Sequence, residues 1–149
     1  MDEAGAGDAL VLLHGVGASR GVWRRAMPRL ARRRRVLAPD LPGFGGSDPA
    51  GAGFDLDAVA DALAAGLADR AAAPFDLVGN SLGGAVAVVL AARRPDLVRA
   101  VIAGDSALYT DHLDPDAAIS YLANLPIGFR EAAIGMNDAV GFRHLLIHG

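Results

Sequence analysis

The sequence contains no cysteine in its 149 residues. This absence excludes disulfide bonds, thiolate metal sites and a cysteine nucleophile, and it agrees with a reducing compartment. The chain also lacks a long apolar run. The longest one, residues 85–92, is far shorter than the roughly 20 residues that span a bilayer. The acidic start, Met1-Asp2-Glu3, leads into no apolar signal core. We therefore expect a soluble, cytoplasmic protein with no membrane partner.

The chain has little net charge and few aromatic residues. The net charge of -3 is too small to favour nucleic acid or an anionic membrane as a partner. Four arginines do follow one another at residues 32–35, but no aromatic residues accompany them that could stack on bases. We interpret this run as a solvated segment that leads into a strand. The length fits one domain with a substantial core.

Four short apolar runs have the pattern of buried parallel strands. Each is stopped by glycine or proline, and they cover residues 9–13, 36–38, 75–78 and 98–103. The gaps between them are long enough for the crossovers that parallel pairing requires. We therefore expect these four runs to form a parallel sheet.

The gaps between these runs have helical patterns. Ser19 can cap a helix that runs to about residue 30, although Pro28 must start, kink or interrupt it. Asp55 can cap a helix over residues 56–69, where the apolar residues keep helical spacing. Residues 81–94 are apolar on nearly every side, which is typical of a helix buried against a sheet. This alternation predicts an α/β fold with a doubly wound, mostly parallel sheet.

The pattern weakens after Gly104. Residues 109–141 mix proline, glycine, aspartate and asparagine with short apolar groups, and two short helices joined by loops fit them. Residues 144–149 fit either one more strand or part of a helix. The sequence leaves that choice open.

The strongest chemical motif is Gly79-Asn80-Ser81-Leu82-Gly83, which lies between a predicted strand and a predicted helix. This context is the one that a G-x-S-x-G nucleophile elbow needs. The turn is so sharp that we expect a positive φ at Ser81. Gly79 and Gly83 would be small enough to fit beside the crowded backbone. The alternative is an ordinary glycine-rich helix start, but the context favours Ser81 as a nucleophile.

A second motif, His14-Gly15-Val16-Gly17, ends the first predicted strand. A serine that attacks a carbonyl creates an oxyanion, which needs two fixed N–H donors. We expect Leu82 to provide one and Val16 the other, with Gly17 as the alternative to Val16. Loss of one such donor costs roughly 2.7–4 kcal/mol. We interpret His14 as a structural imidazole that braces its own loop.

A third motif covers residues 39–48 and contains Asp40 and Asp48. Its glycines and prolines predict a rigid turn after the second strand. We interpret both aspartates as turn and cap residues, not as catalytic acids.

In this order the three segments closely resemble the α/β-hydrolase superfamily. They read LVLLHGVGAS at 10–19, RVLAPDLPGFGGSD at 35–48 and FDLVGNSLGGAVAVVLAARRPDLVRAVIAGDSA at 75–107. The resemblance covers about residues 4–107. It is strongest to single-domain bacterial carboxylesterases, enol-lactonases, carbon–carbon bond hydrolases and cofactor-free haloperoxidases. Ser81 argues against the similar dehalogenase and epoxide hydrolase branches, which place aspartate there.

The resemblance implies that Ser81 is the nucleophile and that the amides of Val16 and Leu82 form the oxyanion hole. It also implies an acid and then a histidine later in the chain. Only about 68 residues follow Ser81, and the family needs well over twice that number. We therefore expect an incomplete fold at both ends, in which residues 108–149 begin a lid and the next strand.

Four later residues are candidates for the acid and the histidine, but none has the sequence context of the family's residues: Asp105, His112, His144 and His148. We expect the catalytic acid and histidine to lie beyond Gly149 and the chain alone to be nearly inert. Its substrate would be a small molecule with an ester, a lactone or an activated carbon–carbon bond. The sequence implies no cofactor and no metal.

Two other hypotheses remain open. The chain could be a non-catalytic, hydrolase-like module that binds a small apolar ligand or another protein. It could also be a fragment of a hydrolase gene without independent function. An open sheet edge would then favour self-association.

Overall fold

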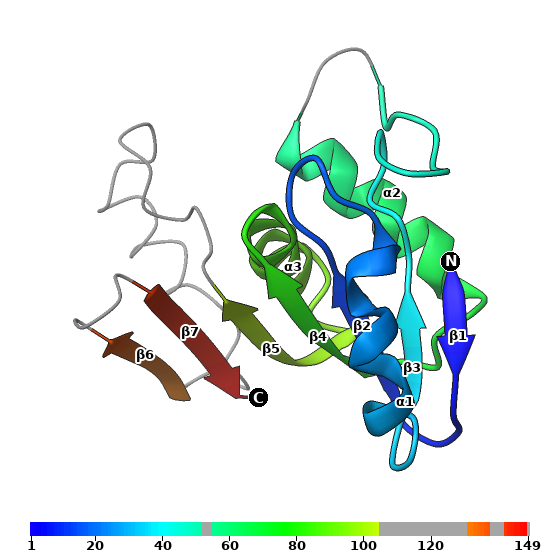
Figure 1. The fold of residues 1–149 in the computed structure, drawn as a ribbon. Helices are drawn as coiled ribbons and strands as arrows, with labels where there is room; N and C mark the ends of the chain where they lie inside the picture. The colour runs from blue at the N-terminus through cyan, green and yellow to red at the C-terminus, as the bar shows by residue number, and fades with distance from the viewer. Residues whose placement is uncertain (52–54, 105–130, 138–141, 149) are drawn as a thin grey trace.

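Four parallel strands form the centre of the sheet in the computed structural model (Figure 1). The structure describes residues 1–51 and 55–104, and the backbone of residues 131–137 and 142–148. The central strands have the order β3-β2-β4-β5. They lie where the apolar runs predicted them, at β2 (Ala9–Leu13), β3 (Arg35–Ala38), β4 (Phe75–Asn80) and β5 (Val98–Gly104).

Three antiparallel strands flank this centre. β1 (Asp2–Ala4) pairs with β3, β7 (Phe142–His148) pairs with β5, and β6 (Glu131–Asn137) pairs with β7. In the described part of the chain the sheet therefore has the order β1-β3-β2-β4-β5-β7-β6. β7 resolves the choice between strand and helix that the sequence left open.

The expectation of two short helices over residues 109–141 is wrong at β6. The backbone of β7 offers hydrogen-bonding groups on its outer side, and β6 pairs with it in register from Glu131↔His148 to Asn137↔Phe142. Strand pairing of this kind overrides a weak local preference. The same expectation also covers residues 109–130 and 138–141, which lie outside the described residues. The candidates Asp105 and His112 lie outside them too.

The helices begin close to where the capping residues predicted. Asp55 accepts a hydrogen bond from the N–H of Asp57 at 3.0 Å and caps α2 (Leu56–Ala68). Ser19 accepts one from Gly21 at 3.4 Å at the start of η1, a 3-10 helix (Arg20–Arg25). The expected single helix is split, because α1 (Met27–Leu30) is a separate turn with Pro28 at its start. Proline has no N–H to continue the preceding turn.

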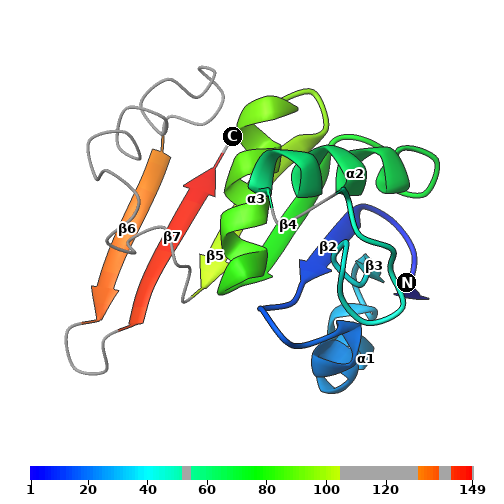
Figure 2. The same cartoon turned by 90° about the horizontal axis from the view of Figure 1, so that it is seen from above.

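Helices cover both faces of the sheet, as a doubly wound fold requires (Figure 2). Alternate residues of β2 point to opposite faces. Val11 and Leu13 join the larger core beneath α2 and α3 (Leu82–Arg93), whereas Leu10 and Leu12 join a smaller core with Met27 of α1. The predicted α/β fold is thus confirmed. No described helix combines the length and the apolar character needed to cross a bilayer.

An ion-pair network ties together the amino ends of the central strands. Asp76 of β4 lies 2.7 Å from Arg34 and 2.9 Å from Arg99. Burial alone would raise the pKa of Asp76, but hydrogen bonds from Arg99 and Arg34 outweigh it and leave this pKa below its ordinary value. Arg35 pairs with Glu3 at 2.8 Å. Of the run at residues 32–35, Arg32 and Arg33 are exposed and Arg35 begins β3, as expected, while Arg34 and Arg35 are partly buried and pair with acidic residues of β4 and β1.

Candidate active site

Ser81 lies at a sharp bend between the end of β4 and the start of α3. Its φ of 53° makes it the only non-glycine residue with positive φ in the described part of the chain. The positive φ expected from the sequence is confirmed. The N–H of Ser81 donates to the carbonyl of Gly104 at 2.8 Å, which ties the bend to the end of β5. Ser81 is partly exposed as a residue, and its side chain makes no capping hydrogen bond to α3.

The two glycines around Ser81 allow an unusually close backbone approach. A Cβ on Gly79 would overlap the backbone of Gly83. A Cβ on Gly83 would lie 2.6 Å from the carbonyl oxygen of His14, a separation that real Cβ atoms essentially never show. The first turn of α3 therefore packs directly on the end of β2. Any side chain at either position would push the helix away from the sheet.

The loop after β2 lies beside Ser81. A Cβ on Gly15 would be 3.2 Å from the Cβ of Ser81 and 3.7 Å from its Oγ. Val16 is 70% exposed, and Gly17 has a φ of +68° with open space where a Cβ would be. Leu82 is the first residue of α3, so its N–H has no acceptor within the helix. The structure thus brings the Gly15 loop and the start of α3 together around Ser81.

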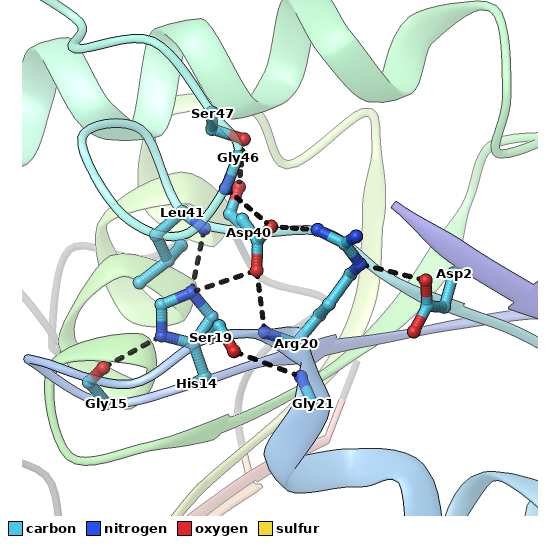
Figure 3. A network of polar contacts seen from close by, with 10 residues as sticks. All are labelled: Asp2, His14, Gly15, Ser19, Arg20, Gly21, Asp40, Leu41, Gly46 and Ser47. Atoms are coloured by element: carbon cyan, nitrogen blue, oxygen red, sulfur yellow. Dashed lines mark hydrogen bonds and ion pairs between the residues drawn. The ribbon is translucent and has the colours of Figure 1, made fainter.

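His14 is fully buried and uses both ring nitrogens (Figure 3). Its Nε2 accepts a hydrogen bond from the N–H of Leu41 at 3.0 Å. Because a backbone N–H can only donate, Nε2 carries no proton, and Nδ1 donates to the carbonyl of Gly15 at 2.8 Å. The ring also packs edge-on against Phe44 at 5.7 Å. The interpretation of His14 as a structural imidazole is confirmed.

Asp40 joins the loop after β3 to the start of η1 (Figure 3). Its carboxylate accepts hydrogen bonds from the N–H of Arg20 at 2.7 Å and of Gly46 at 3.0 Å, and it pairs with the Arg20 guanidinium. Its backbone carbonyl accepts from Ser47 Oγ at 2.9 Å. Burial alone would raise the pKa of Asp40, but these donors outweigh it and the net pKa is lowered.

Asp40 therefore has the turn role expected from the sequence. Its Oδ1 is 4.0 Å from Nε2 of His14, so the two buried groups belong to one cluster. Asp48 closes the same loop through its backbone carbonyl, which accepts from the N–H of Gly43 at 3.0 Å.

The sequence prediction missed Arg20, which pairs with both Asp40 and Asp2. No local pattern marks this residue, since its partners are 20 and 18 positions away. The side chains of His144 and His148 in β7 lie outside the described part of the structure. Among the described residues, no group of three or more His, Cys, Asp or Glu side chains could hold a metal ion.

Comparison with known proteins identifies the family. Residues 8–137 match the family described as alpha/beta hydrolase fold. The 2-hydroxymuconate semialdehyde hydrolase of Pseudomonas sp. strain CF600 is 42% identical over 124 residues, which cover 76% of this chain and 43% of that protein. A pimeloyl-[acyl-carrier protein] methyl ester esterase of Neisseria meningitidis is 49% identical over 90 residues, which cover 60% of this chain and 27% of that protein.

A solved structure gives the same result. The thermophilic esterase of Thermogutta terrifontis superposes with a TM-score of 0.69 at 30% identity, covering 77% of this chain and 42% of that one. The chain thus spans less than half the length of each of these proteins. The matched residues include β2, the bend at Ser81 and β5. The chain belongs to the α/β-hydrolase family.

Proposed function

We propose that this chain carries the nucleophile and the oxyanion hole of a serine hydrolase. One observation supports this proposal above all. Ser81 has a strained, positive φ at the bend between β4 and α3, its side chain makes no helix-capping hydrogen bond, and the residue is partly exposed. Strained backbone of this kind persists where the surroundings over-determine it, and it concentrates at active sites.

In the proposed mechanism, Oγ of Ser81 attacks a carbonyl carbon. The N–H groups of Leu82 and Val16, or of Gly17 in place of Val16, stabilise the oxyanion that forms. The start of α3 adds the positive end of its dipole to the same region. The carbonyl then re-forms as the leaving group departs, and water hydrolyses the ester on Ser81. Each N–H donor would contribute roughly 2.7–4 kcal/mol to lowering the barrier.

The proton of Ser81 needs a base that the described side chains do not provide. His14 is the only histidine among them, and both of its ring nitrogens are already hydrogen-bonded. We propose that the base and its acidic partner lie elsewhere. Without them, an oxyanion hole and binding alone give about 10³–10⁴ over water, so we expect this chain to be a weak catalyst.

The proposed substrate is a small molecule with an ester, a lactone or an activated carbon–carbon bond. The names of two relatives include a semialdehyde hydrolase and a methyl ester esterase, and they support this range of bonds. We further propose that residues 4–107 form the catalytic core, and that residues 108–149 begin a lid and the next strand. The cytoplasmic location stays a prediction.

Both ring nitrogens of His14 are hydrogen-bonded, so this histidine is not free to act as a base. This observation also favours a second candidate function. The chain would then be a non-catalytic module that binds a small apolar ligand or another protein. In that case a ligand would raise the melting temperature without being turned over, and the Ser81→Ala variant would bind it equally well. Turnover that disappears in Ser81→Ala would exclude this alternative.

The test is the hydrolysis of p-nitrophenyl acetate by the purified chain and by two variants. We expect slow release of p-nitrophenol by the wild type and a loss of that release in Ser81→Ala. The neighbouring Asn80 is exposed, so Asn80→Ala provides a matched control that should keep the wild-type rate. A rate that is unchanged in Ser81→Ala would overturn the proposed role of this serine.

A further inference from the structure

Arginines are concentrated in one segment of this chain. Eight of its 14 basic residues lie between residues 20 and 35, and residues 9–39 contain no acidic residue. The chain as a whole carries a net charge of -3. The segment is therefore a basic region within an acidic protein. Such a region attracts anions to the surface that carries it.

Three of the eight arginines have acidic partners. Arg20 pairs with Asp2 and Asp40, while Arg34 pairs with Asp76 and Arg35 with Glu3. The other five are exposed and form no ion pair with any residue whose side chain the structure describes: Arg24, Arg25, Arg29, Arg32 and Arg33. Their guanidinium groups remain available for an external anion.

Two of these five arginines, Arg24 and Arg25, line the same hollow. Arg24 and Arg25 of η1 border an open hollow of about 730 Å³, which Gly17 and Gly45 also line. This volume falls in the range of small-molecule sites. The open space beside Gly17 leaves its backbone accessible.

One residue of the hollow, Gly17, belongs to the loop that borders Ser81. Gly17 is two residues from Gly15, which itself packs against Ser81. Two residues of extended chain span at most about 7 Å. Gly17 therefore lies within about 7 Å of Gly15, a separation that a small substrate molecule can span.

We propose that this hollow is a subsite for an oxyanion group, carboxylate or phosphate, that the substrate carries away from its scissile bond. The planar guanidinium groups of Arg24 and Arg25 match the paired oxygens of either group. Arg20, one turn earlier, cannot serve because Asp2 and Asp40 occupy it. The claim that this site binds part of a substrate rests on the proposed hydrolase function. The claim that it binds an anion does not.

The test follows ¹H–¹⁵N NMR spectra of the full chain during titration with glutarate and, separately, with inorganic phosphate. Ionic strength is held constant so that general screening does not change. We expect saturable shifts at the backbone amides of Gly17 and Gly45 and at the Nε–H groups of Arg24 and Arg25. The anion that binds more tightly identifies the group that the subsite prefers.

A pair of matched variants separates this site from diffuse charge attraction. Arg24→Gln with Arg25→Gln should raise the dissociation constant at least about tenfold, as expected for the loss of hydrogen bonds to a charged group. Arg32→Gln with Arg33→Gln makes the same change in charge outside the hollow and should alter it by less than about twofold. Equal weakening in both double variants, or the absence of saturable shifts with both anions, would overturn the proposal.

The Ser81→Ala variant separates the two proposals. It should bind glutarate or phosphate as tightly as the wild type does. If the anion still binds and Ser81→Ala leaves hydrolysis unchanged, the nucleophilic role of Ser81 is refuted, but the anion site is supported. If Ser81→Ala abolishes hydrolysis but no anion binds, the nucleophilic role is supported and the anion site is refuted.

Discussion

The N–H of Leu41 donates a hydrogen bond to Nε2 of the buried His14 at 3.0 Å. This bond joins the loop after β3 to the loop after β2. Asp40 adds a second connection, because its carboxylate accepts from the N–H of Arg20 at 2.7 Å. The two loops therefore behave as one structural unit at the carboxyl end of the sheet, and Gly15 of this unit packs against Ser81.

The first prediction concerns His14. His14→Ala should lower the free energy of unfolding by about 2–4 kcal/mol, because it leaves the buried N–H of Leu41 without an acceptor and opens a cavity. Urea denaturation measures this change. Arg32→Ala, at an exposed position, should change stability by less than about 0.5 kcal/mol and serves as the control. A loss no larger than that of the control would contradict the buried role of His14.

The second prediction compares two glycines. Gly83→Ala should destabilise the fold by several kcal/mol or prevent folding, because the new Cβ would lie 2.6 Å from the carbonyl oxygen of His14. Gly66→Ala is the matched control, since Gly66 lies within α2 with open space around its Cβ position. It should stabilise the protein by about 0.5–1 kcal/mol. Thermal unfolding of both variants tests the comparison, and a stable Gly83→Ala protein would contradict the close packing of α3 on β2.

Much of the fold could be predicted from the sequence, because the central strands are buried on both faces. Such strands read as continuous apolar runs, and glycine or proline marks their ends. Asp55 and Ser19 marked the helix starts because caps act locally. β1 could not be predicted, since only three residues form it and two of them are acidic. β6 could not be predicted either, because it is stabilised by its pairing with β7 and its own sequence has no strand pattern.

The candidate site was predictable where its geometry depends on adjacent residues. The sequence around Ser81 predicted the bend and the positive φ, because only glycine tolerates the crowding at residues 79 and 83. The pairing of Arg20 with Asp40 was not predictable, because it joins residues 20 positions apart. The exposed arginines at 24 and 25 had a signal that was missed, namely the absence of acidic residues from 9 to 39.

The third prediction concerns the space beside Ser81. Gly15→Ala places a methyl group 3.7 Å from Oγ of Ser81 and 3.2 Å from its Cβ. We expect a loss of stability of about 1–3 kcal/mol, typical of overpacking, and at least a tenfold slower reaction of Ser81 with a fluorophosphonate probe. The control is Gly21→Ala, where the new Cβ would contact only the Oγ of Ser19, at 3.4 Å. Equal labelling rates in the two variants would show that Gly15 does not limit access to the serine.

The fourth prediction concerns acid stability. Folding lowers the pKa of Asp76, so its contribution to stability is complete above its ordinary pKa, about pH 4, and is lost as the pH falls through the lower folded value. Asp76→Asn should cost about 1–3 kcal/mol at pH 7 and make stability less dependent on pH below about pH 4.

Urea denaturation from pH 2 to pH 7 tests the prediction for Asp76. Asp61→Asn is the control, because Asp61 forms an exposed ion pair with Arg93 and should cost less than about 1 kcal/mol. An acid dependence as steep in Asp76→Asn as in the wild type would contradict the prediction.

The fifth prediction concerns the edge of the sheet. β6 is the outermost strand beyond β7 in the described sheet, so one side of its backbone has no partner strand there. We expect concentration-dependent association above the monomer mass of 15.2 kDa, measured by light scattering after size-exclusion chromatography. Ile134→Lys places a charge in this strand and should reduce association. A monomer at every concentration would argue against pairing through β6.

The nucleophilic role of Ser81 is tested most directly by mass-spectrometric mapping of the residue that a fluorophosphonate probe modifies. After prolonged incubation, we expect one adduct on the peptide that contains Ser81, and its loss in Ser81→Ala. An adduct that persists in Ser81→Ala, or one that forms on a different residue of the wild-type chain, would contradict it.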